Sequence, residues 1–289
     1  MKFIISIISL FIFTISGVSI SLAQDKVSPS YKVLCDTINY KDENGKKQGT
    51  WKRYRKDGTL KGIQHYKDSK HTGSAMWYYA SGVKSEEQHY ENGLKHGYWI
   101  YYRDNGSLYK AVTYVNGEKN GINRKYDTKS TLLSEVNLLA GKKEGQSRSF
   151  YASGQIKNQG TYKENDKHGE WREYYENGAV KSEQYYNMGI VDSLSKTYYK
   201  NGVVMVEGFY EAGKYNSSWN NYYKSGKIKK ERKFKDGKLD GFIKEYFENG
   251  QVKVEVKYVD GKKEGKEKMY DENGKNIKTV SYKAGKLIR

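Results

Sequence analysis

Hydrophobic and polar positions recur along this chain with a fixed period of 24 residues. Each unit opens on a glycine or serine, and a Tyr or Phe follows five positions later. A fixed period of roughly 20 to 50 residues is typical of stacked repeat architectures. Ten units follow one another without insertion or deletion, and they open at Gly49, Gly73, Gly97, Gly121, Gly145, Gly169, Ser193, Ser217, Gly241 and Gly265.

Each unit predicts a β-hairpin. The unit from Gly169 has two short aromatic and β-branched runs separated by Asn177-Gly178, a strong hairpin signal whose turn requires φ > 0. A second glycine column follows the second strand and supplies a return turn, so we expect a continuous antiparallel meander. This column consists of Gly93, Gly117, Gly141, Gly189, Gly213, Gly237, Gly261 and Gly285.

Side-chain alternation assigns residues to the two faces of the predicted sheet. In the second strand, Val180 and Tyr186 are an even number of residues apart and share one face, whereas Lys181 and Glu183 lie on the other. The first strand adds tryptophans, and behind them a tyrosine column that includes Tyr174. We expect one packed aromatic face and one solvated Lys/Glu face.

The predicted fold class is all-β: an elongated single-layer antiparallel meander of about ten 24-residue hairpins over 49–289. The one proline, Pro29, precedes this array, which suits a continuous hydrogen-bonded sheet. Apolar residues make up only 36% of the chain, too few for a thick globular core. Two strands per unit at the usual spacing predict a ribbon about 95 Å long.

The first 23 residues have the pattern of a secretory signal peptide. Lys2 is followed by an apolar stretch, and Ser21-Leu22-Ala23 offers small residues for cleavage before Gln24. A membrane anchor is the alternative interpretation. We expect an exported protein, periplasmic, at the cell surface or secreted, in which 24–48 form a leader or partial capping repeat. The single cysteine, Cys35, excludes an internal disulfide.

The repeated motif resembles a known family. Gly-x-Trp-x-x-Tyr-Tyr-x-x-Gly followed by Tyr-x-x-Gly-x-x-x-Gly is similar to the MORN repeat in the variant form common in bacteria, from Gly49 to about Gly285. Ser130, Leu138, Ser193 and Ser217 depart from the pattern. The resemblance implies a scaffold that binds proteins or associates with membranes, and that often dimerises. Some bacterial relatives carry an antitoxin label.

The sequence predicts no catalytic residue, cofactor or metal site. His65 and His89 occupy one column of adjacent units, so they should lie roughly 10 Å apart, too far to share a zinc ion. We interpret all five histidines as surface variation. The carboxylate column that includes Glu183 and Glu231 is interpreted as a solvated charge ladder, because repetition provides no single distinct environment.

Charge suggests where partners bind. Lys+Arg number 52 against 34 Asp+Glu, a formal net charge of +18, and lysines gather in the return turns, which predicts one basic long edge. The candidate partner-binding residues are Trp99, Trp171, Trp219, Lys238, Lys262, Lys263 and Lys286.

The favoured function is an exported, non-catalytic scaffold for a protein partner. Two alternatives stay open: binding of an acidic glycan or anionic membrane, and an antitoxin-like immunity protein. Export disfavours nucleic acid as a partner. The unpaired C-terminal edge strand also predicts a homodimer.

Overall fold

The computed structural model describes residues 38–288, and no helix occurs among them. The predicted signal peptide, Cys35 and most of the leader lie outside the described residues. The strands in chain order are β1 (Tyr40–Lys41), β2 (Lys47–Tyr54), β3 (Leu60–Lys67), β4 (Lys70–His71), β5 (Gly73–Tyr78), β6 (Lys84–Glu91), β7 (Leu94–Lys95), β8 (Gly97–Tyr102), β9 (Leu108–Val115), β10 (Glu118–Lys119), β11 (Gly121–Tyr126), β12 (Leu132–Leu139), β13 (Lys142–Phe150), β14 (Ile156–Lys163), β15 (Asp166–Tyr174), β16 (Val180–Asn187), β17 (Ile190–Val191), β18 (Ser193–Tyr198), β19 (Val204–Glu211), β20 (Lys214–Tyr222), β21 (Ile228–Lys235), β22 (Lys238–Leu239), β23 (Gly241–Tyr246), β24 (Val252–Val259), β25 (Lys262–Tyr270), β26 (Asn276–Lys283) and β27 (Lys286–Ile288).

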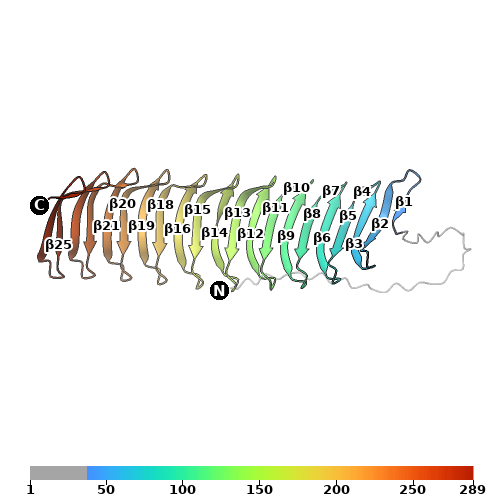
Figure 1. The fold of residues 1–289 in the computed structure, drawn as a ribbon, viewed down its shortest axis with the longest axis horizontal. Coiled ribbons are helices and arrows are strands. Elements are labelled where there is room, and N and C mark those ends of the chain that lie inside the picture. Colours follow the sequence, from blue (N-terminus) through green and yellow to red (C-terminus); the bar gives the residue numbers. More distant parts are fainter. Residues whose placement is uncertain (1–37, 289) are drawn as a thin grey trace, which may run out of the picture. The chain divides into compact units, whose positions relative to one another are not determined.

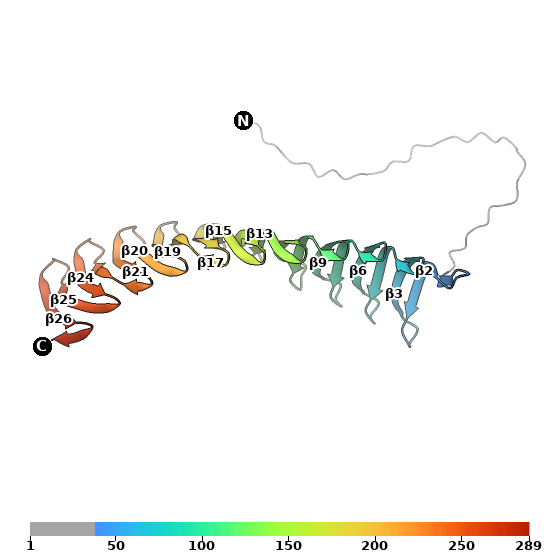
Figure 2. The ribbon, with the colours of Figure 1, turned by 90° about the horizontal axis from the view of Figure 1, so that it is seen from above.

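The strands pair antiparallel in chain order and form one open sheet, which confirms the predicted all-β meander. Figure 1 shows the hairpins side by side from β2 to the C-terminal end, and Figure 2 shows a single layer that twists gradually along the array. At the N-terminal edge, β1 adds a short pair, with Tyr40 opposite Gln48.

From the unit of Gly73 onward, the opening position of each unit is a bulge. Tyr66 of β3 pairs with His71, and Gly62 of β3 pairs with Trp77. Between these two pairs the chain advances four residues on β3 but six on the facing strand, so the facing strand carries two extra residues around Gly73. The opening residue itself has positive φ in all ten units, from 57° at Ser217 to 117° at Gly241. Glycine adopts this conformation without the Cβ clash of other residues, which explains the column.

The two turn columns differ from the sequence-based expectation. In the Asn-Gly column only the glycine has positive φ, for example 84° at Gly178, while the Asn177 Oδ1 accepts a hydrogen bond from the Ala179 N–H at 3.1 Å. These are three-residue loops closed by a left-handed glycine. The return turns instead have positive φ at both central residues, 47° at Met188 and 82° at Gly189. The predicted φ > 0 is therefore confirmed at the glycine of the first column and is wrong at the residue before it.

Candidate interaction surfaces

The aromatic face of the array contains the tryptophans of the first strands and the tyrosines of the second. Trp99 packs against Tyr90 and Tyr114, with ring centroids 5.2 Å away in each case. Its indole N–H donates to the backbone oxygen of His89 at 3.0 Å. Trp171 and Trp219 make the equivalent bonds to Thr161 and Phe209. The ring pairs of Trp99 are edge-to-face and tilted, an arrangement that aromatic side chains favour and that buries apolar surface within a single layer.

Glycines make room for two of these tryptophans. Gly208 lies opposite Trp219, where an added Cβ would come within 2.0 Å of the indole ring. A Cβ added at Gly160 would likewise lie 2.2 Å from the ring of Trp171. Neither glycine has a positive φ, so close approach of the ring explains their identity.

Cations are interleaved with the aromatic rings. The Lys95 Nζ lies 4.1 Å from the Trp99 centroid, and the Lys167 Nζ lies 4.4 Å from that of Trp171. In one unit His71 takes this place, stacked on Tyr90 with centroids 4.7 Å apart. Burial, and then the nearby charges of Arg53 and Lys47, lower the pKa of His71. The interpretation of every histidine as surface variation was wrong for this one.

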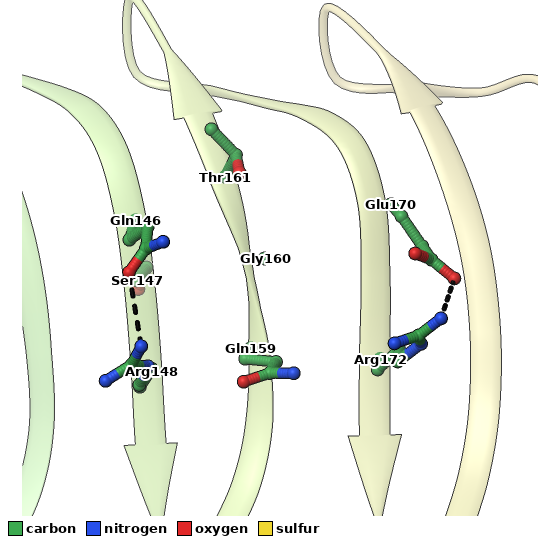
Figure 3. A pocket seen from close by; sticks show the side chains of 8 residues that line it. All are labelled: Gln146, Ser147, Arg148, Gln159, Gly160, Thr161, Glu170 and Arg172. Carbon is green, nitrogen blue, oxygen red and sulfur yellow. Dashed lines mark hydrogen bonds and ion pairs between the residues drawn. The ribbon is translucent and has the colours of Figure 1, made fainter.

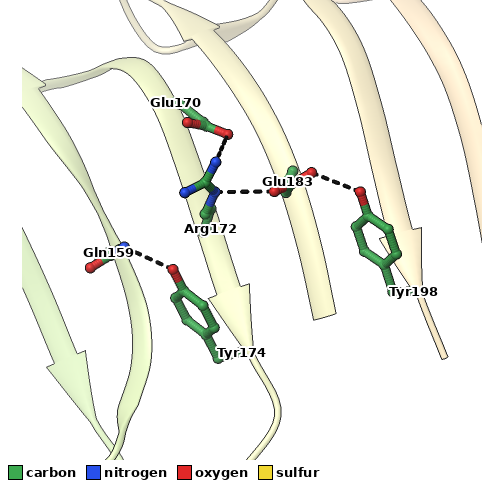
Figure 4. Close-up of polar contacts among 6 residues, drawn as sticks. All are labelled: Gln159, Glu170, Arg172, Tyr174, Glu183 and Tyr198. Carbon is green, nitrogen blue, oxygen red and sulfur yellow. Dashed lines mark hydrogen bonds and ion pairs between the residues drawn. The ribbon is translucent and has the colours of Figure 1, made fainter. Parts of the chain in front are cut away.

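The opposite surface, the charged face, holds the glutamate column with the basic residues of the first strands. Arg172 Nε lies 3.1 Å from Glu183, and the Tyr198 hydroxyl donates to the same glutamate at 2.7 Å (Figure 4). Burial, together with the bond to Glu183, raises the pKa of Tyr198 to about 12. Glu231 repeats the arrangement with Tyr246 at 2.7 Å.

The tyrosine column of the first strands therefore lies on the charged face, not behind the tryptophans. Trp171 and Tyr174 are three positions apart, and an odd separation within a strand alternates faces. Consequently the glutamates of this face are held by phenol and guanidinium groups instead of forming a simply solvated ladder. The next tyrosines along the strand link units: the Tyr175 hydroxyl donates to the backbone oxygen of Tyr198 at 2.6 Å.

An exposed apolar patch interrupts the charged face in the middle of the array. Tyr185, Leu194 and Phe209 are 44%, 47% and 40% exposed, and Leu194 pairs directly with Phe209. Tyr185 and Leu194 also line a surface depression of about 400 Å³ together with Lys196. The sequence analysis missed this patch. The signal was present in one column of the repeat, which has an aromatic residue at Tyr185 and Phe209 and a polar non-aromatic or histidine residue in every other unit.

Nine segments of the chain match the family model of the MORN repeat variant. They are residues 47–68, 72–92, 95–116, 143–164, 167–188, 192–212, 217–236, 239–260 and 263–284. The chain belongs to the MORN repeat variant family. The unit from Gly121, which contains Ser130 and Leu138, is not matched, yet β11 and β12 pair there as in the other MORN units.

No significant match was found among curated proteins. Among solved structures, the TcdB2-TccC3-Cdc42 complex aligns at 11% identity with a TM-score of 0.21, over 82% of this chain and 16% of that chain. A mutant Photorhabdus luminescens Tc holotoxin pore aligns at 12% identity with a TM-score of 0.20, over 84% of this chain and 13% of that one. This MORN array thus spans less than a fifth of those chains.

The predicted partner-binding residues fall into two groups in the MORN array. Trp99, Trp171 and Trp219 are only 4%, 7% and 6% exposed, so their rings build the aromatic face and offer little open surface. The lysines lie near the C-terminal end and are not brought into one site: Lys262 and Lys286 are exposed, Lys238 pairs with Asp260 at 2.6 Å, and Lys263 pairs with Glu267 at 2.6 Å. Their role in partner binding stays a prediction.

The predicted basic edge is weaker than the lysine column suggested. Lys142 and Lys238 pair with acidic residues of the neighbouring return turn, Glu164 and Asp260. Other return-turn lysines, including Lys95, lie over aromatic rings. Much of the positive charge therefore belongs to the aromatic face or is paired.

Between residues 38 and 288, no helix has the length and apolarity needed to cross a membrane. In the same part of the chain, no three His, Cys, Asp or Glu side chains are grouped to hold a metal ion. MORN repeats are generally non-catalytic, and such an array is a scaffold suited to contacts with proteins or membranes.

Proposed function

We propose that this chain is an exported, non-catalytic MORN scaffold that binds a protein partner through the charged face. The apolar patch of Tyr185, Leu194 and Phe209 carries the proposal. Large apolar side chains that adjoin each other at the surface are typical of protein-binding sites. The neighbouring Lys196 and Glu207, 3.7 Å apart, would add a polar rim.

Capture from the native envelope fraction tests the proposal. Mature protein (residues 24–289) is compared with Leu194→Lys, which places a charge within the patch, and with Leu133→Lys, an exposed leucine outside it. We expect a stoichiometric protein partner that survives moderate salt, is lost with Leu194→Lys and is retained with Leu133→Lys. Binding of acidic glycan or anionic vesicles alone, collapsing with salt, would favour the polyanion alternative.

Export is tested separately. The sequence of residues 1–23 supports it, and the exported protein should begin at Gln24 by mass spectrometry of its N-terminal peptide. Retention of the uncleaved N-terminus would instead favour the membrane-anchor alternative. An antitoxin-like role would require the captured partner to be a toxin whose activity the protein suppresses.

A further inference from the structure

On the charged face between Arg124 and Lys268, basic residues and carboxylates alternate from strand to strand, with interruptions at two positions. Glu135 lies between Arg124 and Arg148, with nitrogen–oxygen distances of 3.3 and 3.5 Å. Glu183 lies opposite Arg172 and Lys196. In these units, therefore, a glutamate side chain fills the space between two cations on neighbouring strands.

Gln159 breaks the alternation. The strand register places it directly opposite Arg148 on one side and Arg172 on the other. A neutral amide thus stands between two guanidinium groups, whereas the units before and after it place Glu135 and Glu183 at the same position of the column. Its Nε2 donates to the Tyr174 hydroxyl at 2.8 Å, whereas the equivalent Tyr198 hydroxyl donates to Glu183.

A depression of about 330 Å³ lies at this interruption, and we call it the Gln159 site. Its lining includes Gln146, Arg148, Gln159, Thr161, Glu170 and Arg172. Figure 3 shows the two arginines on either side of Gln159, on strands β13 and β15. The volume is sufficient for one small ligand group, such as an amino-acid side chain.

The arginines of the Gln159 site retain donors for a ligand. Arg148 bonds to Gln146 at 3.2 Å and Arg172 to Glu170 at 2.8 Å, in addition to their contacts with Glu135 and Glu183. A guanidinium has five N–H donors, so neither is exhausted by these bonds. Glu170 is the one acid in the lining, and it competes with an incoming anion for Arg172.

We propose that the Gln159 site binds the carboxylate of an acidic side chain, glutamate or aspartate, from a protein partner. The chain's own glutamates show that such a side chain fits between basic residues at this spacing. Arginine provides paired, charge-assisted hydrogen bonds to a planar carboxylate. This inference rests on the proposed protein-binding function and assigns it a second contact, apart from the apolar patch.

A peptide titration tests the inference. The probe is an N-acetylated, C-amidated tetraglutamate, and the readout is the shift of the arginine side-chain Nε–H resonances in the full chain. We expect saturable shifts at Arg148 and Arg172 that weaken as salt is raised, and none with tetraglutamine. Gln159→Glu should weaken binding about tenfold or more, because its own carboxylate occupies the site. Glu170→Gln should strengthen it about threefold by releasing Arg172.

Gln155→Glu is the matched control. It makes the same change of charge in the exposed turn of the same hairpin, and should leave the affinity within about twofold, as expected for a screened surface charge. Gln159→Glu places a carboxylate between two arginines, as Glu135 does in the preceding unit, so it should keep the fold, and the thermal midpoint checks this. The inference would be overturned if Gln159→Glu and Gln155→Glu lowered the affinity for tetraglutamate equally, or if Gln159→Glu left that affinity unchanged.

Trigalacturonate provides a second arm. Binding of this sugar with the same Gln159 dependence, and no binding of tetraglutamate, would overturn the assignment to a protein side chain. Failure of the peptide while capture through the Leu194 patch persists would remove this inference and leave the proposed function standing. If the envelope capture returned no protein partner while tetraglutamate still bound at the Gln159 site, the proposed function would fail and the carboxylate-binding site would remain.

Discussion

Two serines occupy backbone positions that favour glycine. Ser193 and Ser217 open their units with φ of 92° and 57°, where the other eight units have glycine. A side chain with a Cβ is strained in this region, by about 1–2 kcal/mol in the left-handed conformation.

Ser193→Gly should therefore stabilise the protein. We expect the free energy of unfolding to rise by about 1 kcal/mol, because relief of the Cβ clash outweighs the greater freedom of glycine in the unfolded chain. Denaturant titration measures the change. The reverse substitution Gly169→Ser, at φ 73°, should lower stability by a similar amount. A loss of stability with Ser193→Gly would show that the serine side chain contributes more than its strain costs.

His71 makes stability depend on pH. Its folded pKa is lowered by burial in the stack with Tyr66 and Tyr90, so the unfolded chain binds the proton more tightly. Its contribution to stability is present above the unfolded pKa of about 6.5 and is lost as the pH falls toward the folded value. His71→Tyr, which copies Tyr215 in the same column, should reduce the fall of the thermal midpoint as the pH is lowered below about 6.5.

The control is His65→Tyr. The His65 ring belongs to another column and lies outside the stack of His71 with Tyr66 and Tyr90. Its Nδ1 contacts the backbone oxygen of Ser74 at 2.6 Å. The pH dependence should remain in this variant. Identical profiles for His71→Tyr and the unsubstituted protein would contradict an effect of the stacked histidine.

At the scale of elements, the charged face joins each hairpin to the next through side chains as well as through the ladder. Asn220 is the counterpart of Gln159, because a neutral residue stands between two carboxylates, Glu207 and Glu231. Repulsion between them is reduced by the Tyr222 and Tyr246 hydroxyls, each of which donates to one glutamate. A cation at this position would restore the alternation found elsewhere on the face.

Asn220→Lys should stabilise the array by about 0.3–1 kcal/mol, since cross-strand opposite charges are favourable on a partly exposed face. Chemical denaturation at low and high salt measures the gain, which should shrink as salt screens the pair. Ser153→Lys adds the same charge in an exposed turn and should change stability by less. A gain independent of salt would point to side-chain packing instead of ion pairing.

Sequence reasoning identified the hairpins, because the 24-residue period and glycine columns report directly on strands and turns. It placed the Tyr174 column on the wrong face, although the three-residue offset from Trp171 indicated the opposite one. The bulges could not be predicted from the sequence, because a register shift of two residues depends on how neighbouring strands pair. The Gln159 site was missed for the same reason: only the register brings Arg148 and Arg172 to the two sides of one glutamine.

At the scale of the whole array, each repeat contacts its sequence neighbours through strand pairing. Stability in such an arrangement is approximately a sum of repeat and nearest-neighbour terms. A local defect should therefore loosen the repeats that share it and leave distant repeats protected. Gly208 and Trp219 provide a defect of known location, because they face one another across the junction of two units.

Gly208→Ala should place a methyl group against the Trp219 ring, where the available distance is only 2.0 Å. Overpacking of this kind costs about 1–3 kcal/mol. Hydrogen exchange followed by mass spectrometry should show faster exchange in β18–β21 and little change in β5 and β6, near the other end of the array. Gly160→Ala, which meets Trp171 in the same way, should move the fast-exchanging region to β13–β16. Uniform loss of protection with both variants would mean that the array unfolds as one cooperative unit, because nearest-neighbour coupling would then exceed the stability of each repeat.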